Sequence, residues 1–205
     1  MPETFSVTFH PQAAVVAGEV SAAALISVVG TEAKPAEVDA SLFDGKILRL
    51  AFDDTPWPTP WQYRGVTYVG PSQGQVAEAM AFARTVAGPI AVHCLHGQSR
   101  STAIALAIIA DRCRNGDEAV RLLCETAARL PSATWPEWVC TTDVALAVVD
   151  RKPIPRARPR LQPNPGIVRY AESLLEMPGQ LDGPLAAACP HYQSWRRFWG
   201  ENGWR

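Results

Sequence analysis

A polar loop between two apolar segments, Pro89–Val92 and Arg100–Arg114, constrains the fold more than any other feature. The first segment has the length and β-branched character of a buried strand, and the second is apolar around a full helical length. Both therefore belong in a hydrophobic core. The loop between them reads HCLHGQS and carries two histidines, a cysteine and a glycine before Arg100. Reactive side chains placed between a buried strand and a buried helix indicate a functional site.

The rest of the chain repeats the alternation of strand and helix. Apolar runs bounded by turn residues predict strands at 5–9, 24–29, 46–51 and 66–69, and apolar spacings of three and four predict helices at 73–86, 117–130 and 165–176. Ser72 is the expected N-cap of the first of these helices. Strands alternating with helices predict an α/β fold: a mostly parallel, twisted sheet of about four or five strands flanked by helices.

Composition and charge narrow the class of protein. With 205 residues, of which 47% are apolar and 19% charged, the chain has the composition of a globular protein of one ordinary domain. The net charge of -1 provides no field that would attract nucleic acid or anionic lipid. The sequence has neither a secretory signal nor a long apolar stretch, so we expect a cytoplasmic protein without a membrane partner.

The five cysteines are odd in number and lack CxxC pairing. This pattern argues against a disulfide framework and against a zinc site. We therefore expect no metal and no cofactor.

The chemistry of the loop points to an anion. In α/β sheets, ligands bind beyond the carboxyl ends of the strands, and a helix N-terminus offers backbone N–H groups and a positive dipole. Arg100 can grip two oxygens of a phosphate, and Gly97 allows a tight curl of the backbone. The same field favours the thiolate form of Cys94. The expected feature is a phosphate-binding loop between a strand and a helix.

The loop sequence His93-Cys94-Leu95-His96-Gly97-Gln98-Ser99-Arg100-Ser101 resembles the HC-x5-R-[ST] signature of the cysteine-dependent protein tyrosine phosphatases, and is most similar to the dual-specificity branch. A second stretch agrees. Arg158-Pro159 and Pro163-Asn164-Pro165-Gly166-Ile167 resemble the R-P-x-x-x-P-N-x-G-[FI] segment that opens the last helix of that branch.

The resemblance implies a role for each residue of the loop. Cys94 would attack phosphorus, Arg100 would bind the equatorial oxygens, and Ser101 would donate a hydrogen bond to the sulfur. His93 would orient the loop from a buried position. The residues that would surround the bound phosphate are Leu95, His96, Gly97, Gln98 and Ser99.

The family also uses an aspartic acid from a neighbouring loop to protonate the leaving group. Asp53 and Asp54 follow the predicted strand 46–51, and strand alternation alone does not choose between them. The family pattern favours Asp54 as the general acid, with Asp53 in a supporting role. An alignment on Trp57-Pro58, as in the larger tyrosine phosphatases, would place Thr59 where those enzymes have aspartate.

The resemblance also divides the chain. We expect a phosphatase-like domain over 1–180 with an insertion at 132–152, and an aromatic C-terminal extension over 181–205 that packs on the domain. Trp57 and Trp61 could rim a pocket, although packing is the simpler expectation.

The function predicted first is hydrolysis of phosphomonoesters through a cysteinyl-phosphate, with a phosphorylated protein or peptide as partner and phosphotyrosine, or phosphoserine and phosphothreonine, as substrate. His96 also resembles the histidine in the HCTHGxNRTG loop of RNA 5'-triphosphatases, but Ser99 and Ser101-Thr102 depart from that pattern. An RNA 5'-triphosphate or an inositol phosphate is therefore the alternative substrate. The third alternative is a phosphate-binding module without catalysis.

Overall fold

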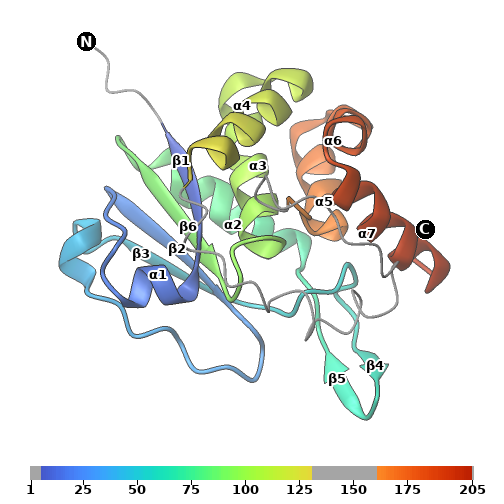
Figure 1. The fold of residues 1–205 in the computed structure, drawn as a ribbon, viewed down its shortest axis with the longest axis horizontal. Coiled ribbons are helices and arrows are strands. Elements are labelled where there is room, and N and C mark those ends of the chain that lie inside the picture. The colour runs from blue at the N-terminus through green and yellow to red at the C-terminus, as the bar shows by residue number, and fades with distance from the viewer. Residues whose placement is uncertain (1–5, 131–160, 205) are drawn as a thin grey trace.

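A parallel four-stranded sheet, covered by helices on both faces, organises the protein (Figure 1). The computed structural model describes residues 6–130 and 161–204, so the predicted insertion at 132–152 lies outside the described residues. The strands of the sheet, in spatial order, are β1 (Val7–Pro11), β6 (Ile90–Cys94), β2 (Ala24–Val29) and β3 (Ile47–Ala51). The α/β class and the parallel sheet agree with the sequence prediction.

Two apolar clusters lie on the two faces of the sheet. The larger one joins the sheet to α2 (Gln73–Arg84), α3 (Arg100–Cys113), α4 (Gly116–Arg129), α5 (Pro165–Leu175) and α6 (Asp182–Ala188). The smaller one joins it to α1 (Gln12–Val16) and the 3-10 helix η1 (Ala40–Phe43). Neighbouring residues of β2 divide between the clusters, since Ile26 belongs to the larger and Leu25 to the smaller.

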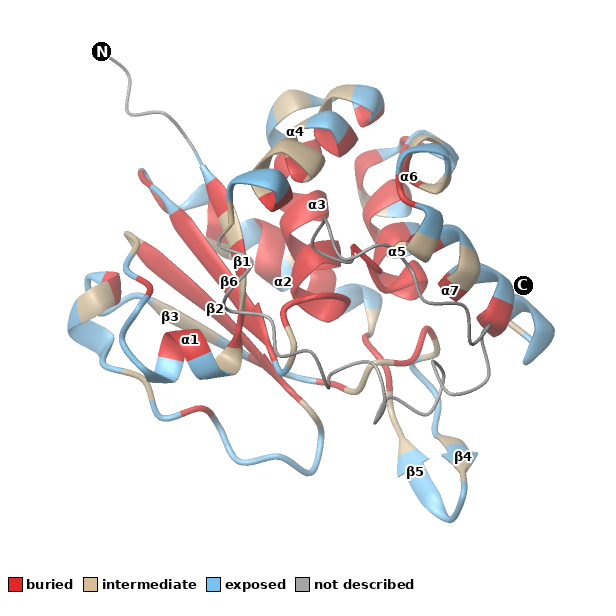
Figure 2. Cartoon of the chain, in the orientation of Figure 1, coloured by how far each residue is buried: buried red, intermediate tan, exposed pale blue. Residues whose placement is uncertain are grey.

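The centre of the fold is formed by β2, β6 and α3. Every residue of both strands is buried, and so is every residue of α3 from Arg100 to Ala110 (Figure 2). Helix α3 is therefore surrounded by protein over most of its length, as its apolar sequence predicted. A buried strand that leads directly into a buried helix fixes the loop between them at both ends.

Parallel strands bring their carboxyl ends to one edge of the sheet. Pro11 lies beside Cys94 in the register of β1 and β6, and Val29 lies beside Ala51 in that of β2 and β3. The loops that follow these strands therefore meet at the edge where Cys94 lies. Helix α2 is fixed to the same edge, since the Gln75 amide donates to the Ala51 carbonyl at 2.9 Å. Ser72 caps this helix, as predicted.

The strand predicted at 66–69 forms, but outside the main sheet. Strand β5 (Val66–Tyr68) pairs antiparallel with β4 (Trp61–Tyr63), and the two form a hairpin that projects from the molecule (Figure 1). Arg64 and Gly65 between them both have positive φ, 49° and 79°. Positive φ at both central residues is the geometry of a two-residue hairpin turn, which matches the right-handed twist of paired strands.

The C-terminal extension forms two helices, of which the sequence had predicted only the packing. Helix α6 contributes Leu185 to the larger cluster, and Tyr192 of α7 (Pro190–Glu201) is completely buried there. The Tyr192 hydroxyl donates to Asp182 Oδ1 at 2.7 Å. Burial of this residue on the domain anchors α7 to the core.

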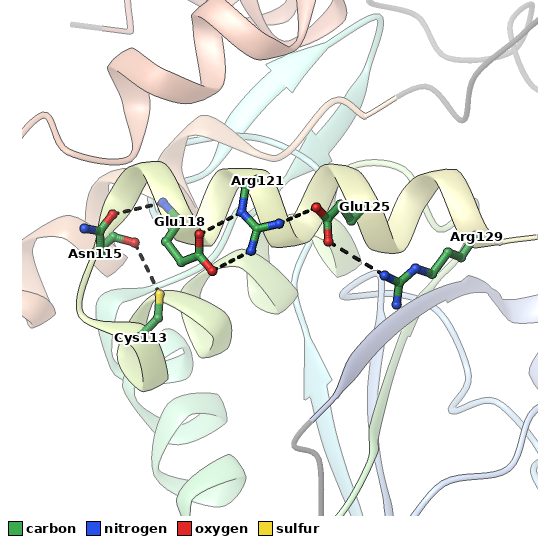
Figure 3. Close-up of polar contacts among 6 residues, drawn as sticks. All are labelled: Cys113, Asn115, Glu118, Arg121, Glu125 and Arg129. Carbon is green, nitrogen blue, oxygen red and sulfur yellow. Dashed lines mark hydrogen bonds and ion pairs between the residues drawn. The ribbon is translucent and has the colours of Figure 1, made fainter.

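Helix α4 shows how an outer helix is stabilised on its exposed face. Asn115 caps it by accepting a hydrogen bond from the Glu118 N–H at 2.9 Å (Figure 3). Arg121 then pairs with Glu118 on one side and with Glu125 on the other, and Glu125 pairs with Arg129. Exposed pairs of this kind add little stability.

Within the described ranges, no helix combines the length and the apolar character needed to cross a bilayer.

Candidate active site

The loop that carries the signature begins at Cys94, the last residue of β6, and ends at Arg100, the first residue of α3. Gly97 makes its sharpest bend, with φ of 70°. A Cβ at this position would lie 2.6 Å from the backbone carbon of His10 and from the nitrogen of Pro11. The Gln12 N–H also donates to the Leu95 carbonyl at 3.3 Å. The loop is therefore packed closely against the end of β1, where only glycine fits.

The sulfur of Cys94 lies among hydrogen-bond donors. The Gly97 N–H donates to Sγ at 3.2 Å, and the Ser101 hydroxyl lies 3.2 Å from the same atom. The sulfur also lies at the N-terminal end of α3, the positive end of the helix dipole. Cys94 is only 3% exposed. Donors and dipole are placed to stabilise negative charge on this sulfur.

Arg100 contributes a guanidinium group, only part of whose N–H groups are hydrogen-bonded to the described residues. Its Nη1 donates to the Phe52 carbonyl at 2.9 Å, which fixes the guanidinium beside the segment that follows β3. Its Nε is buried and has no hydrogen-bond partner among the described residues. A buried donor without a partner costs about 1–3 kcal/mol. An anion bound in the loop would satisfy it, and a guanidinium can bind two oxygens of such an anion at once.

His93 precedes the nucleophile and is completely buried. Its Nε2 lies 2.8 Å from the Ser27 hydroxyl of β2. Burial lowers the pKa of this imidazole to about 4, so the ring is neutral at neutral pH. A neutral, buried imidazole bonded to the neighbouring strand orients the loop and adds no positive charge to it.

The two candidate acids have different surroundings. Asp53 accepts hydrogen bonds from the Thr31 N–H at 3.1 Å, the Thr31 hydroxyl at 2.7 Å and the Val69 N–H at 2.9 Å. It thereby joins the segments that follow β2 and β5. Asp54 instead accepts from the Ser99 hydroxyl at 2.6 Å. Of the pair, Asp54 reaches the signature loop and Asp53 supports the backbone beside it.

Asn164 is a site residue to which the sequence assigned no role. It is completely buried, and its Oδ1 caps α5 by accepting from the N–H groups of Gly166 and Ile167. Its Nδ2 donates to Asp54 Oδ1 at 3.0 Å and to the Thr55 carbonyl at 3.1 Å. One amide therefore begins a helix and positions the candidate acid. The signal in the sequence was Asn164 followed by proline and glycine, which predicts a cap but not its second partner.

The other loop residues divide between outward and inward positions. Leu95 is 53% exposed, and His96 is half-buried, with a pKa lowered by burial and by the positive charge of Arg100. Gln98 and Ser99 are buried, and the carbonyl of Gln98 accepts from the Thr102 hydroxyl at 2.6 Å. Leu95 and His96 are therefore more accessible than Gln98 and Ser99.

These contacts gather a cysteine sulfur, an arginine with an unpartnered Nε and a carboxylate around the N-terminus of α3. No family model matches the chain, and no curated protein matches it. Two solved structures are similar in fold. The first is PTPMT1 in complex with PI(5)P, with a TM-score of 0.45 and 11% sequence identity, and the match covers 90% of this chain and 95% of that one. The second is PTPMT1, with a TM-score of 0.44 and 12% sequence identity, and the match covers 89% of this chain and 94% of that one.

Proposed function

We propose that this protein is a cysteine-dependent phosphatase that hydrolyses phosphomonoesters through a cysteinyl-phosphate. The proposal rests on the contacts of Cys94 Sγ. This sulfur accepts a hydrogen bond from the Gly97 N–H at 3.2 Å and lies 3.2 Å from the Ser101 hydroxyl. Arg100 begins the helix behind it with an Nε that lacks a partner among the described residues. A thiolate needs such donors, and a phosphoryl group needs such a cation.

In the first step the Cys94 thiolate attacks phosphorus in line with the leaving oxygen. The S–P bond forms as the P–O bond breaks, and the leaving oxygen takes a proton from the Asp54 carboxyl group. The hydrogen bonds that the described residues give to Asp54 both fall on Oδ1, so Oδ2 is free to carry that proton. Arg100 and the loop amides hold the equatorial oxygens, over which the charge is spread.

In the second step water attacks the phosphorus of the cysteinyl-phosphate. The Asp54 carboxylate accepts the proton of the water, the S–P bond breaks, and phosphate leaves. The electron pair returns to the sulfur, where the Ser101 hydroxyl can donate a hydrogen bond. Asp54 is protonated again, and Cys94 is again a thiolate. Each residue therefore ends the cycle in the state in which it began.

For the substrate we propose phosphotyrosine in a protein or peptide, with phosphoserine and phosphothreonine as further substrates. The support is the sequence of the loop, which is most similar to the dual-specificity branch. The exposed Leu95 on the loop offers an apolar contact for an aromatic ring. An RNA 5'-triphosphate or an inositol phosphate remains the alternative for the same cradle.

The test is a substrate panel of phosphotyrosine and phosphoserine peptides, an inositol phosphate and a triphosphate RNA, run with wild type, Cys94→Ser and Asp54→Ala. We expect phosphate release by the wild type, none by Cys94→Ser, and a loss of about 100-fold or more by Asp54→Ala on the peptides. A triphosphatase would tolerate Asp54→Ala, because its leaving group needs less protonation. Activity retained in Cys94→Ser, or peptide binding without turnover by the wild type, would contradict the proposal.

A further inference from the structure

The acid loop, residues 53–60, follows β3 and contains neither helix nor strand. Its start is fixed by Asp53, and its middle lies against α5, where a Cβ on Gly166 would be 2.4 Å from the Pro56 carbonyl oxygen. Its far end leads into the β4–β5 hairpin, whose base is closed by the Gly70 N–H donating to the Trp57 carbonyl at 2.8 Å. Because the loop lacks regular structure, its far end is held by this backbone hydrogen bond and by side-chain contacts.

Trp57, three positions after Asp54, meets the C-terminal helix. Its ring centroid lies 5.2 Å from that of Trp199 of α7, with the planes at 89°. Trp61 of β4 lies 5.3 Å from the same ring, at 76°. The rings of Trp57 and Trp61 are 5.7 Å apart. Trp199 therefore packs edge-on against both tryptophans that frame the end of the acid loop, in the geometry that aromatic pairs prefer.

Trp199 is also the centre of the aromatic cluster within α7. It is 2% exposed, and its ring lies 5.2 Å from Trp195 and 5.0 Å from Phe198. Helix α7 is held in turn by Tyr192, buried in the main core, and by the ion pair of Arg196 with Asp182 at 2.9 Å. Tyr192 thus anchors α7 to the core, and a separate aromatic cluster that includes Trp199 joins α7 to Trp57. Figure 1 shows α7 on the side of the molecule from which the hairpin projects.

We propose that Trp199 is a positioning residue for the candidate acid. By packing against Trp57 and Trp61 it holds the far end of the acid loop, so that the Asp54 carboxyl group stays within hydrogen-bond distance of Ser99 above the cysteine loop. The inference rests on the proposed phosphatase activity and gives a positioning role to a C-terminal helix distant from Cys94 in the sequence. Without the Trp199 ring, Asp54 would spend less time where a leaving group needs its proton.

The test compares aryl phosphates whose leaving groups differ in their need for a proton. For Trp199→Ala we expect kcat/KM, which reports the first step, to fall about 10-fold or more with phenyl phosphate but less than about threefold with 2,4-dinitrophenyl phosphate, since only the first leaving group requires general acid catalysis. The basic limb of the pH profile of kcat/KM should flatten, as we also expect for Asp54→Asn. Adding Trp199→Ala to Asp54→Asn should cause little further loss.

Trp195→Ala is the matched control, because Trp195 lies one helical turn away and its ring pairs with Trp199 and Phe198 fall within α7. It should lower stability without changing the dependence on the leaving group. Trp199→Phe, which keeps an aromatic ring, should retain most of the activity with phenyl phosphate. If Trp199→Ala does not fold, Trp57→Leu removes the same contact from the other side and should show the same selective loss.

Equal losses with both substrates in Trp199→Ala and Trp57→Leu would overturn the positioning role while leaving the phosphatase proposal intact. A wild-type protein inactive on every phosphomonoester would overturn both. Rates are normalised to the amount of Cys94 that reacts with iodoacetate, so that a smaller folded fraction is not mistaken for a slower enzyme.

Discussion

Asp54 Oδ1 accepts a 2.6 Å hydrogen bond from the hydroxyl of Ser99, forty-five positions along the chain, and this contact joins the acid loop to the loop that carries Cys94. It selects one aspartate of an adjacent pair. Asp53 bonds Thr31 and Val69 and faces backbone that has no part in the proposed chemistry. We therefore propose a chemical role for Asp54 and a structural role for Asp53.

Replacing the two aspartates one at a time should separate these roles. Asp54→Asn should lower kcat on a phosphotyrosine peptide by about 100-fold or more and leave the free energy of unfolding nearly unchanged. Asp53→Ala should lower the free energy of unfolding by about 1–3 kcal/mol, because its loss leaves backbone and hydroxyl donors without an acceptor. Urea unfolding and steady-state kinetics on both variants measure this. The opposite pattern would make Asp53 the acid.

Asn164 should matter twice, once for the helix and once for the acid. Asn164→Ala removes the cap of α5, which costs about 0.5–2 kcal/mol, and also removes the donor to Asp54 Oδ1. We expect kcat on phenyl phosphate to fall several-fold in addition to the loss of stability. Asn115→Ala is the matched control, since Asn115 caps α4 and lies in the surface network of Figure 3. It should lower stability without changing kcat; equal kinetic effects of the two variants would contradict the role of Asn164.

The cysteine loop should not tolerate a side chain at Gly97. Alanine there would be strained at φ of 70°, and its Cβ would meet the backbone of His10 and Pro11 at 2.6 Å. Gly97→Ala should therefore abolish most activity and weaken inhibition by vanadate, because the loop could not keep its bend at residue 97. Gly183→Ala in α6, where a Cβ meets open space, should leave both unchanged. Vanadate inhibition of Gly97→Ala as tight as that of the wild type would show that the loop adapts.

His93 should make the protein less stable in acid. Burial lowers the pKa of His93 to about 4 in the folded state. In the unfolded chain the pKa has its ordinary value of about 6.5. The unfolded state therefore binds the proton first, and stability is lost as pH falls from about 6.5 towards 4, by about 1.4 kcal/mol per pH unit at most. His93→Gln, which can keep a bond to Ser27, should show a smaller loss between pH 7 and pH 5 in urea unfolding. Burial also lowers the pKa of His10 to about 4, so His10 adds to the loss of stability in the wild type and in His93→Gln.

The local sequence was sufficient to predict the strand, the loop and the helix that carry Cys94 and Arg100, because each of them depends on the order of residues within a short segment. An apolar β-branched run, a glycine at the bend and an apolar helix specify that unit through burial and backbone sterics. The resemblance in the same segment supplied the proposed chemistry. For the same reason the helices at 73–86, 117–130 and 165–176 were predicted close to where they form.

Only the tertiary structure decided which aspartate reaches the loop, because strand alternation ends at Ala51 and the choice depends on Ser99 and on Asn164, which is 110 positions away. It also placed strand 66–69 in a separate hairpin and brought Trp199 against Trp57. Contacts between such distant segments are set by how sheet and helices pack, and no short run of sequence encodes that packing. The sequence determined the local structure of the cysteine loop, and the fold determined which side chains surround it.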